Sequence, residues 1–420
     1  MQTKRVRGVK DILPEVAKKI QYIEYTCQSL SEKFGFKKII LPIIENFQLY
    51  QHSLGFTSDI VEKQMFIIQN KSQEEKETFV LRPEGTAGMV RAFVENNFKN
   101  RYYLKRFFYF GPMFRYERPQ KGRYREFYQF GLEIFEEPPG SGDVVLVSLI
   151  NKILKELSID FILEVNTIGC PECRGKILDV VKNELNKVKD ILCDSCKIKL
   201  EKNPLRILDC KTDIVKIDKD ILEKINIQNH ICKRCKKEFE VVINLFEILS
   251  ISYKIEPKIV RGLDYYNGFV FEYKCYKLEG AQNTICAGGR YDFLISQFDR
   301  QTNFACGAAL GIDRILDVIS EEFRNNETKI KVGIGIVEDK YIGKSFEMLD
   351  IISKNFEDVV VIGPFGNRSL KSQLRLFNNE NCRYVIIIGD EIKENKIIIK
   401  DFEKNKQEIL KIEDLKNYLI

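Results

Sequence analysis

The sequence FRYERPQKGRYREF, residues 114–127, places fixed positive charges and aromatic rings around a single turn. Its arginines stay charged and can grip a phosphate through two parallel hydrogen bonds, while an aromatic face can stack on a base. Residues 101–125 hold eight Lys or Arg against one acid, Glu117. A solvated basic loop is the commoner explanation of such a run. The five aromatics of residues 107–114, with glycine and proline at the edges, favour a nucleotide-binding hairpin instead.

The segments around this hairpin predict helices combined with an antiparallel meander. Residues 15–34 carry one apolar stripe at helical spacing, which fits a core or a dimer interface equally well. A strand at residues 36–42 is stopped by Pro42, and a turn at residues 82–86 opens a helix. Long strands are expected within residues 101–135, a helix at 143–157 and a strand at 269–273. The fold class is therefore α+β.

Composition excludes several classes of protein. The 420 residues allow two or three domains, and the 44% hydrophobic and 30% charged residues are typical of a globular protein. Because no apolar run approaches the roughly twenty residues of a membrane helix, we expect a cytoplasmic protein without a membrane partner. The net charge of +6 favours local basic surfaces over a DNA-coating protein. Neither of the two histidines, His52 and His230, lies in a catalytic pattern.

Seven of the twelve cysteines lie in residues 170–235, as three Cys-x-x-Cys pairs and the single Cys210. In a cytoplasmic chain this spacing favours a structural Zn²⁺ over disulfides, although reduced, partly buried thiols remain the alternative. Sequence order alone does not determine which cysteines share an ion. The set we predict is Cys193, Cys196, Cys232 and Cys235.

Beyond residue 328 the pattern changes to alternating strands and helices, at residues 331–337, 341–355, 359–362, 369–378 and 384–388. This spacing predicts a small α/β domain with a partly parallel sheet, preceded by a polar linker at residues 321–331. We therefore expect a catalytic domain at residues 1–325, a Cys-rich insertion within it at 170–240, and a C-terminal domain at 331–420.

Two motif groups complete the pattern. VRGLDYY, residues 260–266, precedes the strand at 269–273, and AGGRYD, residues 287–292, is expected to form a glycine turn. GAALGIDR, residues 307–314, has small residues that would let the backbone approach a flat ligand, followed by an arginine on a first helical turn. Glycines in a strand are commonly packing devices, so these motifs are informative only in combination.

In combination they resemble class II aminoacyl-tRNA synthetases, and specifically the histidyl-tRNA synthetase family of bacterial type, along essentially the whole chain. The three class-wide motifs would be residues 15–45, 114–133 and 307–314, and the two histidine-specific signatures are residues 261–266 and 287–292. Ala309 and Tyr128 depart from the usual residues without removing a needed charge. The resemblance implies a class II core on an antiparallel sheet, a C-terminal anticodon-binding domain and a homodimer. Zinc is not implied, because only part of the family has the insertion.

The implied activity is ligation of L-histidine to tRNA(His) with ATP and Mg²⁺, through a histidyl-adenylate and release of pyrophosphate. Catalysis would be positioning and charge neutralisation without a protein nucleophile. The resemblance places Arg115 and Arg261 at the α-phosphate, Arg123 and Arg314 on the outer phosphates, and Phe127 and Glu117 on adenine.

The resemblance also implies which residues recognise histidine. Glu133 and Tyr266, with Tyr265 beside it, would face the imidazole, and the ammonium would lie among Glu84, Thr86 and Gln129. From the residues alone, Glu133 could equally be a strand-edge carboxylate in a salt bridge. Gln120 would meet the tRNA acceptor end, and Lys371, Arg375 and Phe377 are candidates for the anticodon.

Two other functions fit parts of this pattern. One is an inactive synthetase-like protein that senses an amino acid as a regulatory subunit; it is disfavoured because Arg115, Arg261, Arg314 and the C-terminal domain are all present. The other is a class II synthetase for threonine or proline, which the signature at residues 261–266 disfavours.

Overall fold

The structure is a computed structural model that describes residues 4–55, 58–69, 77–208, 210, 212–278, 283–299, 304–320 and 329–419. The chain forms two compact units, Met1–Phe323 and Arg324–Ile420. Most of the predicted linker, residues 321–328, lies outside the described residues. No helix in the part of the chain that the structure describes has the length and apolar character needed to cross a membrane.

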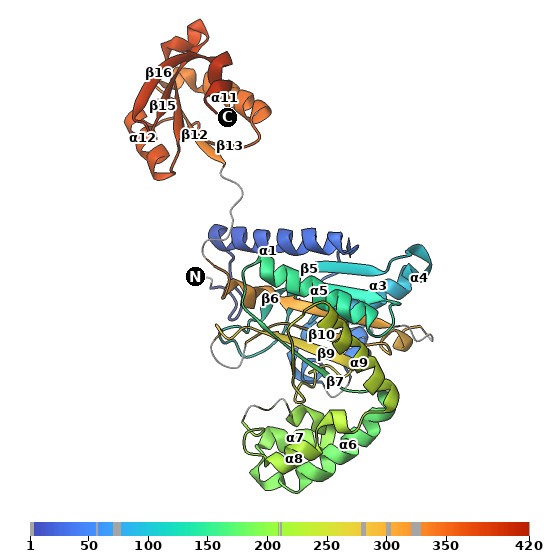
Figure 1. Cartoon of the computed structure of the whole chain (residues 1–420). Coiled ribbons are helices and arrows are strands. Elements are labelled where there is room, and N and C mark those ends of the chain that lie inside the picture. The colour runs from blue at the N-terminus through green and yellow to red at the C-terminus, as the bar shows by residue number, and fades with distance from the viewer. Residues whose placement is uncertain are drawn as a thin grey trace. The chain divides into compact units, whose positions relative to one another are not determined.

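An eight-stranded sheet forms the centre of the first unit, in the order β1-β5-β6-β11-β10-β9-β7-β8 (Figure 1). Its pairs are antiparallel except for β1 with β5 and β7 with β8. The strands are β1 Lys37–Lys38, β5 Arg106–Phe114, β6 Glu126–Phe135, β7 Ile162–Thr167, β8 Lys254–Ile255, β9 Asn267–Lys274, β10 Thr284–Arg290 and β11 Ala305–Gly311. The predicted antiparallel meander is confirmed.

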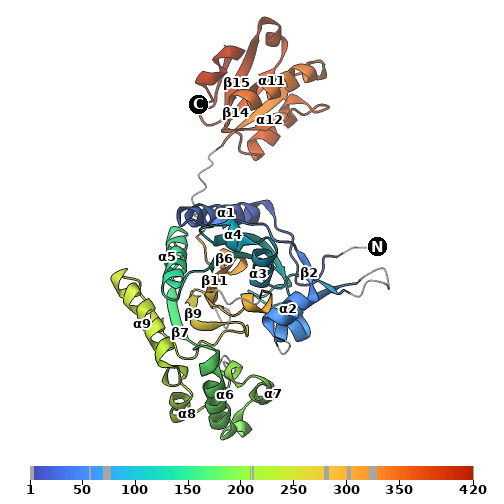
Figure 2. The same ribbon diagram turned by 90° about the vertical axis from the view of Figure 1, so that its right-hand side faces the viewer.

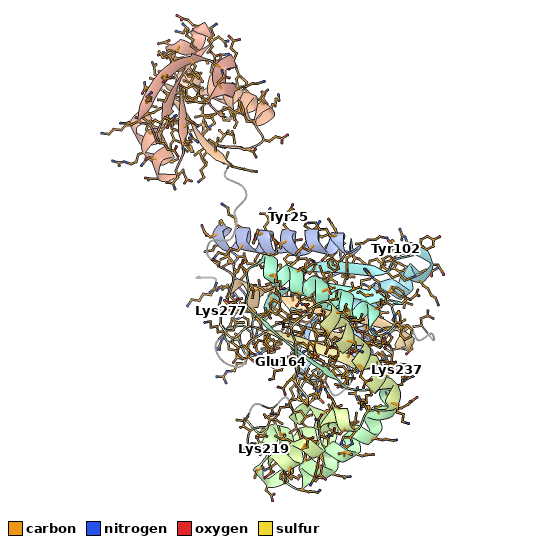
Figure 3. The ribbon with its side chains drawn as sticks, in the orientation of Figure 1. Tyr25, Tyr102, Glu164, Lys219, Lys237 and Lys277 are labelled. Atoms are coloured by element: carbon orange, nitrogen blue, oxygen red, sulfur yellow. The ribbon has the colours of Figure 1, made fainter. Side chains whose placement is uncertain are left out.

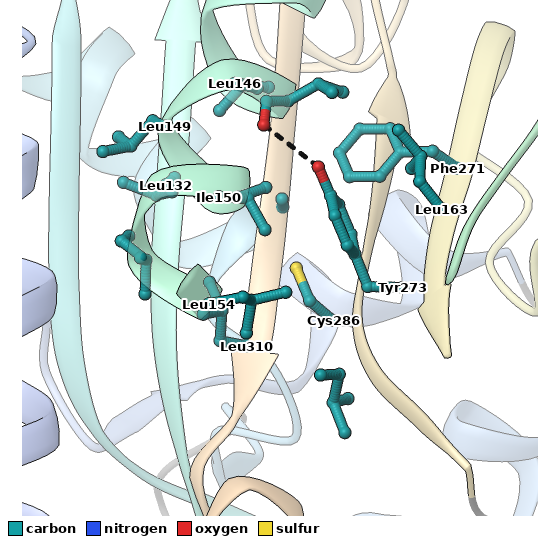
Figure 4. Close-up of a cluster of buried hydrophobic side chains, with 14 of the residues drawn as sticks. Leu132, Leu146, Leu149, Ile150, Leu154, Leu163, Phe271, Tyr273, Cys286 and Leu310 are labelled. Carbon is teal, nitrogen blue, oxygen red and sulfur yellow. Dashed lines mark hydrogen bonds between the residues drawn. The ribbon is translucent and has the colours of Figure 1, made fainter. Parts of the chain in front are cut away.

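Helices α1 (Pro14–Lys33), α5 (Ser141–Glu156) and α9 (Lys233–Ile248) pack along one face of this sheet (Figure 2). The main core lies beneath α5, where leucines of the helix meet Leu132, Leu163 and Phe271 of the strands (Figure 4). The Tyr273 hydroxyl is buried there and donates to the Val147 carbonyl oxygen at 3.0 Å. A buried hydroxyl without an acceptor would be costly, so this bond fixes the tyrosine within an otherwise apolar core.

The elements between β1 and the hairpin, and the helix after β11, are short. A three-stranded sheet has the order β2-β4-β3. The elements before the hairpin are β2 Ile44–Asn46, α2 Phe47–Leu54, the π-helix Ile60–Gln64, β3 Phe66–Ile68, β4 Phe79–Leu81, α3 Thr86–Glu95 and α4 Phe98–Arg101, and α10 Ile312–Leu316 follows β11.

Two predictions are corrected. The strand expected at residues 36–42 is only β1, and the glycine turn expected at residues 287–292 is mostly strand β10.

Residues between β7 and α9 form a helical lobe with its own apolar core (Figures 1 and 2). Its helices are α6 Pro171–Asn186, α7 Asp194–Lys202 and α8 Lys219–Lys224, with 3-10 turns at Lys189–Ile191, Pro204–Ile207 and Ile227–Asn229. Lys219 begins α8 and Lys237 lies on α9, and both side chains project from these helices into solvent (Figure 3). The lobe occupies the segment where the Cys-rich insertion was predicted.

The second unit is a five-stranded sheet in the order β13-β12-β14-β15-β16. It comprises β12 Ile330–Ile336, α11 Ile342–Asn355, β13 Val359–Ile362, α12 Leu370–Asn379, β14 Tyr384–Ile388, β15 Lys396–Asp401 and β16 Lys406–Lys411, with 3-10 turns at Asp339–Tyr341, Asp390–Glu394 and Ile412–Asn417. Strands β12, β13 and β14 are parallel, and the other pairs are antiparallel. One candidate contact is corrected: Phe377 is fully buried in a cluster with Phe365 and Val385, so its ring is not exposed to an RNA base.

Candidate active site

A cavity of about 600 Å³ lies on the face of the large sheet opposite α5. Alternation along β6 produces this division. Phe130, Leu132 and Ile134 point into the core under α5, whereas Phe127 and Gln129 line the cavity. Its volume is that of a site for a small ligand.

Four guanidinium groups, Arg115, Arg123, Arg261 and Arg314, line this one cavity. Burial lowers the pKa of Arg115, and burial together with repulsion from Arg123 and Arg115 lowers the pKa of Arg314. Like charges gathered in a partly desolvated space repel each other, so a polyanion in the cavity would be strongly favoured. The arrangement is that of a phosphate site.

The hairpin of β5 and β6 supplies the first part of this site. Arg115 donates through Nε to the Pro83 carbonyl oxygen at 2.9 Å, and its guanidinium carbon lies 5.2 Å from the centre of the Phe127 ring. Glu117 is paired with Arg123, with 3.5 Å between Oε2 and Nε. The loop turns at Gly122, where the positive φ of 72° favours glycine. This geometry presents two cations, a carboxylate and a ring on one wall.

The segment before β9 supplies another part of the wall. Arg261 donates through Nη1 to Glu272 on β9 at 2.6 Å, and its guanidinium carbon lies 5.4 Å from the centre of the Tyr266 ring. This ion pair fixes the direction of the arginine while leaving it part of the cavity wall. Tyr265 and Tyr266 are nearly buried, and both line the cavity.

Acceptors gather at the end of the cavity next to α3. Glu84 caps this helix, because its carboxylate accepts the backbone N–H groups of Thr86 at 2.8 Å and Ala87 at 2.9 Å. Burial raises the pKa of Glu84. The side-chain oxygen of Gln129 is buried and has no hydrogen-bond donor among the described residues. A cationic donor bound here would satisfy an acceptor that is otherwise costly to bury.

Glu133 lies behind this wall rather than in it. Its carboxylate is fully buried and accepts hydrogen bonds from Thr86 at 2.8 Å, from Tyr109 at 3.2 Å and from Tyr291. Burial raises its pKa to about 8, although the three hydroxyl donors oppose the rise. Thr86 and Tyr109 line the cavity, whereas Glu133 itself does not. The alternative of a salt-bridged strand-edge carboxylate is wrong, because its partners are hydroxyl groups.

Eleven predicted residues line the cavity: Glu84, Thr86, Arg115, Glu117, Arg123, Phe127, Gln129, Arg261, Tyr265, Tyr266 and Arg314. Gln120 does not, because it lies exposed at the tip of the hairpin, where it pairs with Arg123 through the backbone. Four residues that were not predicted also line the cavity: Tyr109, Leu208, Ile214 and Glu272. The aromatic alternation of β5 could have indicated Tyr109. Leu208 and Ile214 belong to the insertion and carried no signal.

The glycine signatures have mainly structural roles. Arg290 is 2% exposed and donates to Asp143 at 2.8 Å and Asp292 at 2.9 Å, so it joins α5 to β10 and does not reach the cavity. A side-chain carbon at Gly307 would lie 1.7 Å from the Glu133 carboxylate. Gly307 therefore makes room for a buried acid, while Ala308 and Ala309 beside it line the cavity.

The predicted zinc ligands fall into two separate groups. Cys170, Cys173, Cys232 and Cys235 lie together, and Cys193, Cys196 and Cys210 lie with Asp213. Within each group the candidate ligand atoms are within 4.8 Å of one another. The predicted set of Cys193, Cys196, Cys232 and Cys235 is therefore wrong as a single site. Sequence order could not reveal that the first pair, Cys170 and Cys173, meets the last one in space.

Comparison with known proteins identifies the family. The family model described as histidyl-tRNA synthetase matches residues 8–315. The histidine–tRNA ligase of Nitratiruptor sp. is 38% identical over 100% of both chains. That of Thermodesulfovibrio yellowstonii is 39% identical over 97% of this chain and 96% of its own. The crystal structure of apo histidyl-tRNA synthetase from S. aureus covers 100% of both chains with a TM-score of 0.80 and 28% identity. The chain belongs to the histidyl-tRNA synthetase family.

Proposed function

We propose that this protein ligates L-histidine to tRNA(His) in two steps, with a histidyl-adenylate as the intermediate. The observation that carries the proposal is the cavity itself, which is lined by four guanidinium groups together with Glu84, Thr86 and Gln129. Such a site fits a polyphosphate beside an amino acid. The relatives named above are histidine–tRNA ligases, matched over nearly their full length.

In the first step, a histidine carboxylate oxygen attacks the α-phosphorus of ATP and pyrophosphate leaves. Arg115, which follows β5, and Arg261, which precedes β9, both line the cavity and would hold the α-phosphate between them. Their charge stabilises the equatorial oxygens as negative charge builds up on them, and both guanidiniums are already oriented by Pro83 and Glu272. Mg²⁺, bound to the ATP phosphates, would neutralise further charge.

The hairpin would bind the rest of ATP. The Phe127 ring would stack on adenine, and the Glu117 carboxylate would accept a hydrogen bond from the adenine amino group. Arg123 and Arg314 would hold the outer phosphates. Both arginines reach the loop that carries Gly122, since Arg123 follows it and Arg314 donates to its carbonyl oxygen at 3.5 Å. The hairpin and the start of α10 would therefore close on ATP together.

Histidine would lie between the α3 end and the two tyrosines. Its ammonium group would be held by Glu84, Thr86 and the unsatisfied oxygen of Gln129. Tyr266, with Tyr265 packed against it, would meet one imidazole nitrogen. Glu133 would accept a hydrogen bond from the other imidazole nitrogen when the hydroxyl of Thr86 or Tyr109 moves aside. A ligand that lacks these polar atoms would leave buried groups unpaired, which discriminates by a factor of about 10⁴ or more.

In the second step the terminal adenosine hydroxyl of tRNA attacks the adenylate carbonyl. Gln120 is exposed at the hairpin tip and would contact the acceptor end. The second unit would bind the anticodon, with the exposed Lys371 and Arg375 of α12 as candidates. We also propose a homodimer, with exposed apolar residues such as Ile40, Ile44 and Ile67 in the interface.

The test of the catalytic assignment is Arg261→Ala in histidine-dependent ATP–pyrophosphate exchange. Removing a preorganised cation at the reacting phosphate should lower turnover by about 10²- to 10³-fold while histidine binding changes little. Arg101→Ala is the control, because Arg101 is exposed on α4 and lies outside the cavity. Near-normal exchange by Arg261→Ala would refute the role given to Arg261.

A further inference from the structure

The first and last residues of the insertion lie close together, and four cysteine thiols gather there. Cys170 and Cys173 stand where the chain leaves β7 for α6, and Cys232 and Cys235 stand where it returns through α9. Sγ of Cys170 lies 3.5 Å from Sγ of Cys173, that of Cys232 lies 3.5 Å from that of Cys235, and those of Cys173 and Cys235 are 4.0 Å apart. All four cysteines are free thiols.

These separations match a tetrahedral metal site. Four thiolates bound to Zn²⁺ at about 2.3 Å are separated by edges of about 3.8 Å. The three distances above deviate from that edge by only a few tenths of an ångström, and the four sulfurs lie within 4.8 Å of one another. Four close thiols without an ion would gain little from one another, since S–H groups are weak donors and acceptors.

A second group lies at the start of α7. Cys193, just before that helix, and Cys196 within it lie close to Cys210 and Asp213, which follow in the sequence. Asp213 is fully buried and already fastens this loop to the helix, because it accepts the Cys193 backbone N–H at 2.9 Å. Three thiolates and one carboxylate oxygen are a ligand set that Zn²⁺ accepts. The two groups have no cysteine in common.

The second group is linked to the histidine-specific signature at residues 261–266. Asn203 and Arg206, which lie between α7 and Cys210 in the sequence, bind the segment that carries Arg261. Asn203 donates to Asp264 at 2.9 Å, and Arg206 donates to the Gly262 carbonyl oxygen at 3.0 Å. Leu208 and Ile214, which flank Cys210 and Asp213 in the sequence, line the active-site cavity.

We propose that the insertion holds two zinc ions with different tasks. The ion bound by Cys170, Cys173, Cys232 and Cys235 joins the two ends of the insertion. The ion bound by Cys193, Cys196, Cys210 and Asp213 fixes the loop that supports the signature segment and forms part of the cavity wall. The task of the second ion rests on the proposed function, whereas the presence of both ions does not.

Metal analysis of untagged full-length protein, purified without chelators, tests both sites. We expect two zinc ions per chain, released by a mercurial reagent that blocks thiols. Cys173→Ser and Cys196→Ser should each lose one ion, and Cys382→Ser should keep both, because Cys382 is a buried cysteine of the second unit outside both groups. Replacing zinc with Co²⁺ should give the visible absorption of tetrahedral thiolate sites.

Less than one zinc per chain in wild-type protein, with unfolding unaffected by chelation, would overturn both sites. Stoichiometric iron would overturn the assignment to zinc. If the cysteine variants fail to fold, Asp213→Asn and Asp213→Cys supply the test of the second site, the first weakening zinc retention and the second preserving it.

The task of the second ion has a separate readout. Loss of that zinc in Cys196→Ser should lower histidine-dependent exchange by up to about a hundredfold, because a small displacement of positioned groups is enough for such a loss. A variant that lacks one zinc yet exchanges normally would overturn the link to the active site while leaving the metal sites standing. Exchange absent from the zinc-loaded wild-type protein would instead count against the proposed function.

Discussion

Replacing Glu133 by glutamine should change how stability depends on pH. Glu133 is fully buried, accepts hydrogen bonds from Thr86, Tyr109 and Tyr291, and has a pKa raised from 4.5 to about 8 by burial. In the unfolded chain this carboxyl loses its proton near pH 4.5, whereas in the folded protein it keeps the proton until about pH 8. Between these values the folded state binds one more proton.

The sign follows from that difference. Because the folded state holds the extra proton, raising the pH from 4.5 towards 8 lowers the free energy of unfolding. At about 1.4 kcal/mol per pH unit, the full window corresponds to about 5 kcal/mol. Glutamine does not titrate, so this contribution disappears. It also loses part of the hydrogen bonding to three hydroxyls, at a cost of about 1–3 kcal/mol that does not depend on pH.

We therefore expect the stability curves to cross. Glu133→Gln should be less stable than wild type at pH 5 and more stable at pH 8.5. Thermal unfolding of the full chain, followed across this range, measures the difference, which should reach about 3–6 °C at pH 8.5 for a unit of this size. Glu240→Gln is the control, since Glu240 is exposed on α9 of the same unit. Parallel pH curves for wild type and Glu133→Gln would refute this reasoning about the buried carboxyl.

Three further perturbations test the structure and the proposed function. Gly307→Ala should destabilise the first unit by about 1–3 kcal/mol or prevent its folding, since the added carbon would lie 1.7 Å from Glu133; urea unfolding measures this, and a neutral effect would contradict the packing. Asp143→Asn breaks a buried pair with Arg290 and should cost about 3–5 kcal/mol in the same assay, whereas Glu95→Gln at the exposed last residue of α3 should cost far less. Binding of tRNA should weaken with salt, and Lys371→Ala should reduce the slope of log K against log salt by about one; salt-independent binding would count against the proposed tRNA surface.

Local patterns predicted the elements whose signals are local. The alternation after residue 328 identified β12, α11, β13, α12 and β14 to within about two residues, as expected where helix and strand periodicities differ clearly. The charge and aromatic pattern of residues 114–127 located the hairpin, and the resemblance supplied eleven residues that the fold brings to one cavity.

Features set by long-range packing were not predictable in this way. The glycines of residues 287–292 resemble a turn, yet they form strand β10 because its neighbours β9 and β11 need close approach. Phe377 lies on an amphipathic helix, but the side it occupies is determined by the sheet beneath it. Which cysteines lie together depends on the path of the whole insertion, since its first and last Cys-x-x-Cys pairs meet where the chain enters and leaves it.

The most direct test of the central claim is ATP–pyrophosphate exchange with each of the twenty amino acids, using full-length protein and Mg²⁺ without tRNA. We predict exchange with histidine alone, because only an imidazole offers ring nitrogens both to Tyr266 in the cavity wall and to Glu133 behind it. Folded protein that binds histidine but supports no exchange with any amino acid would contradict the account and favour a regulatory subunit.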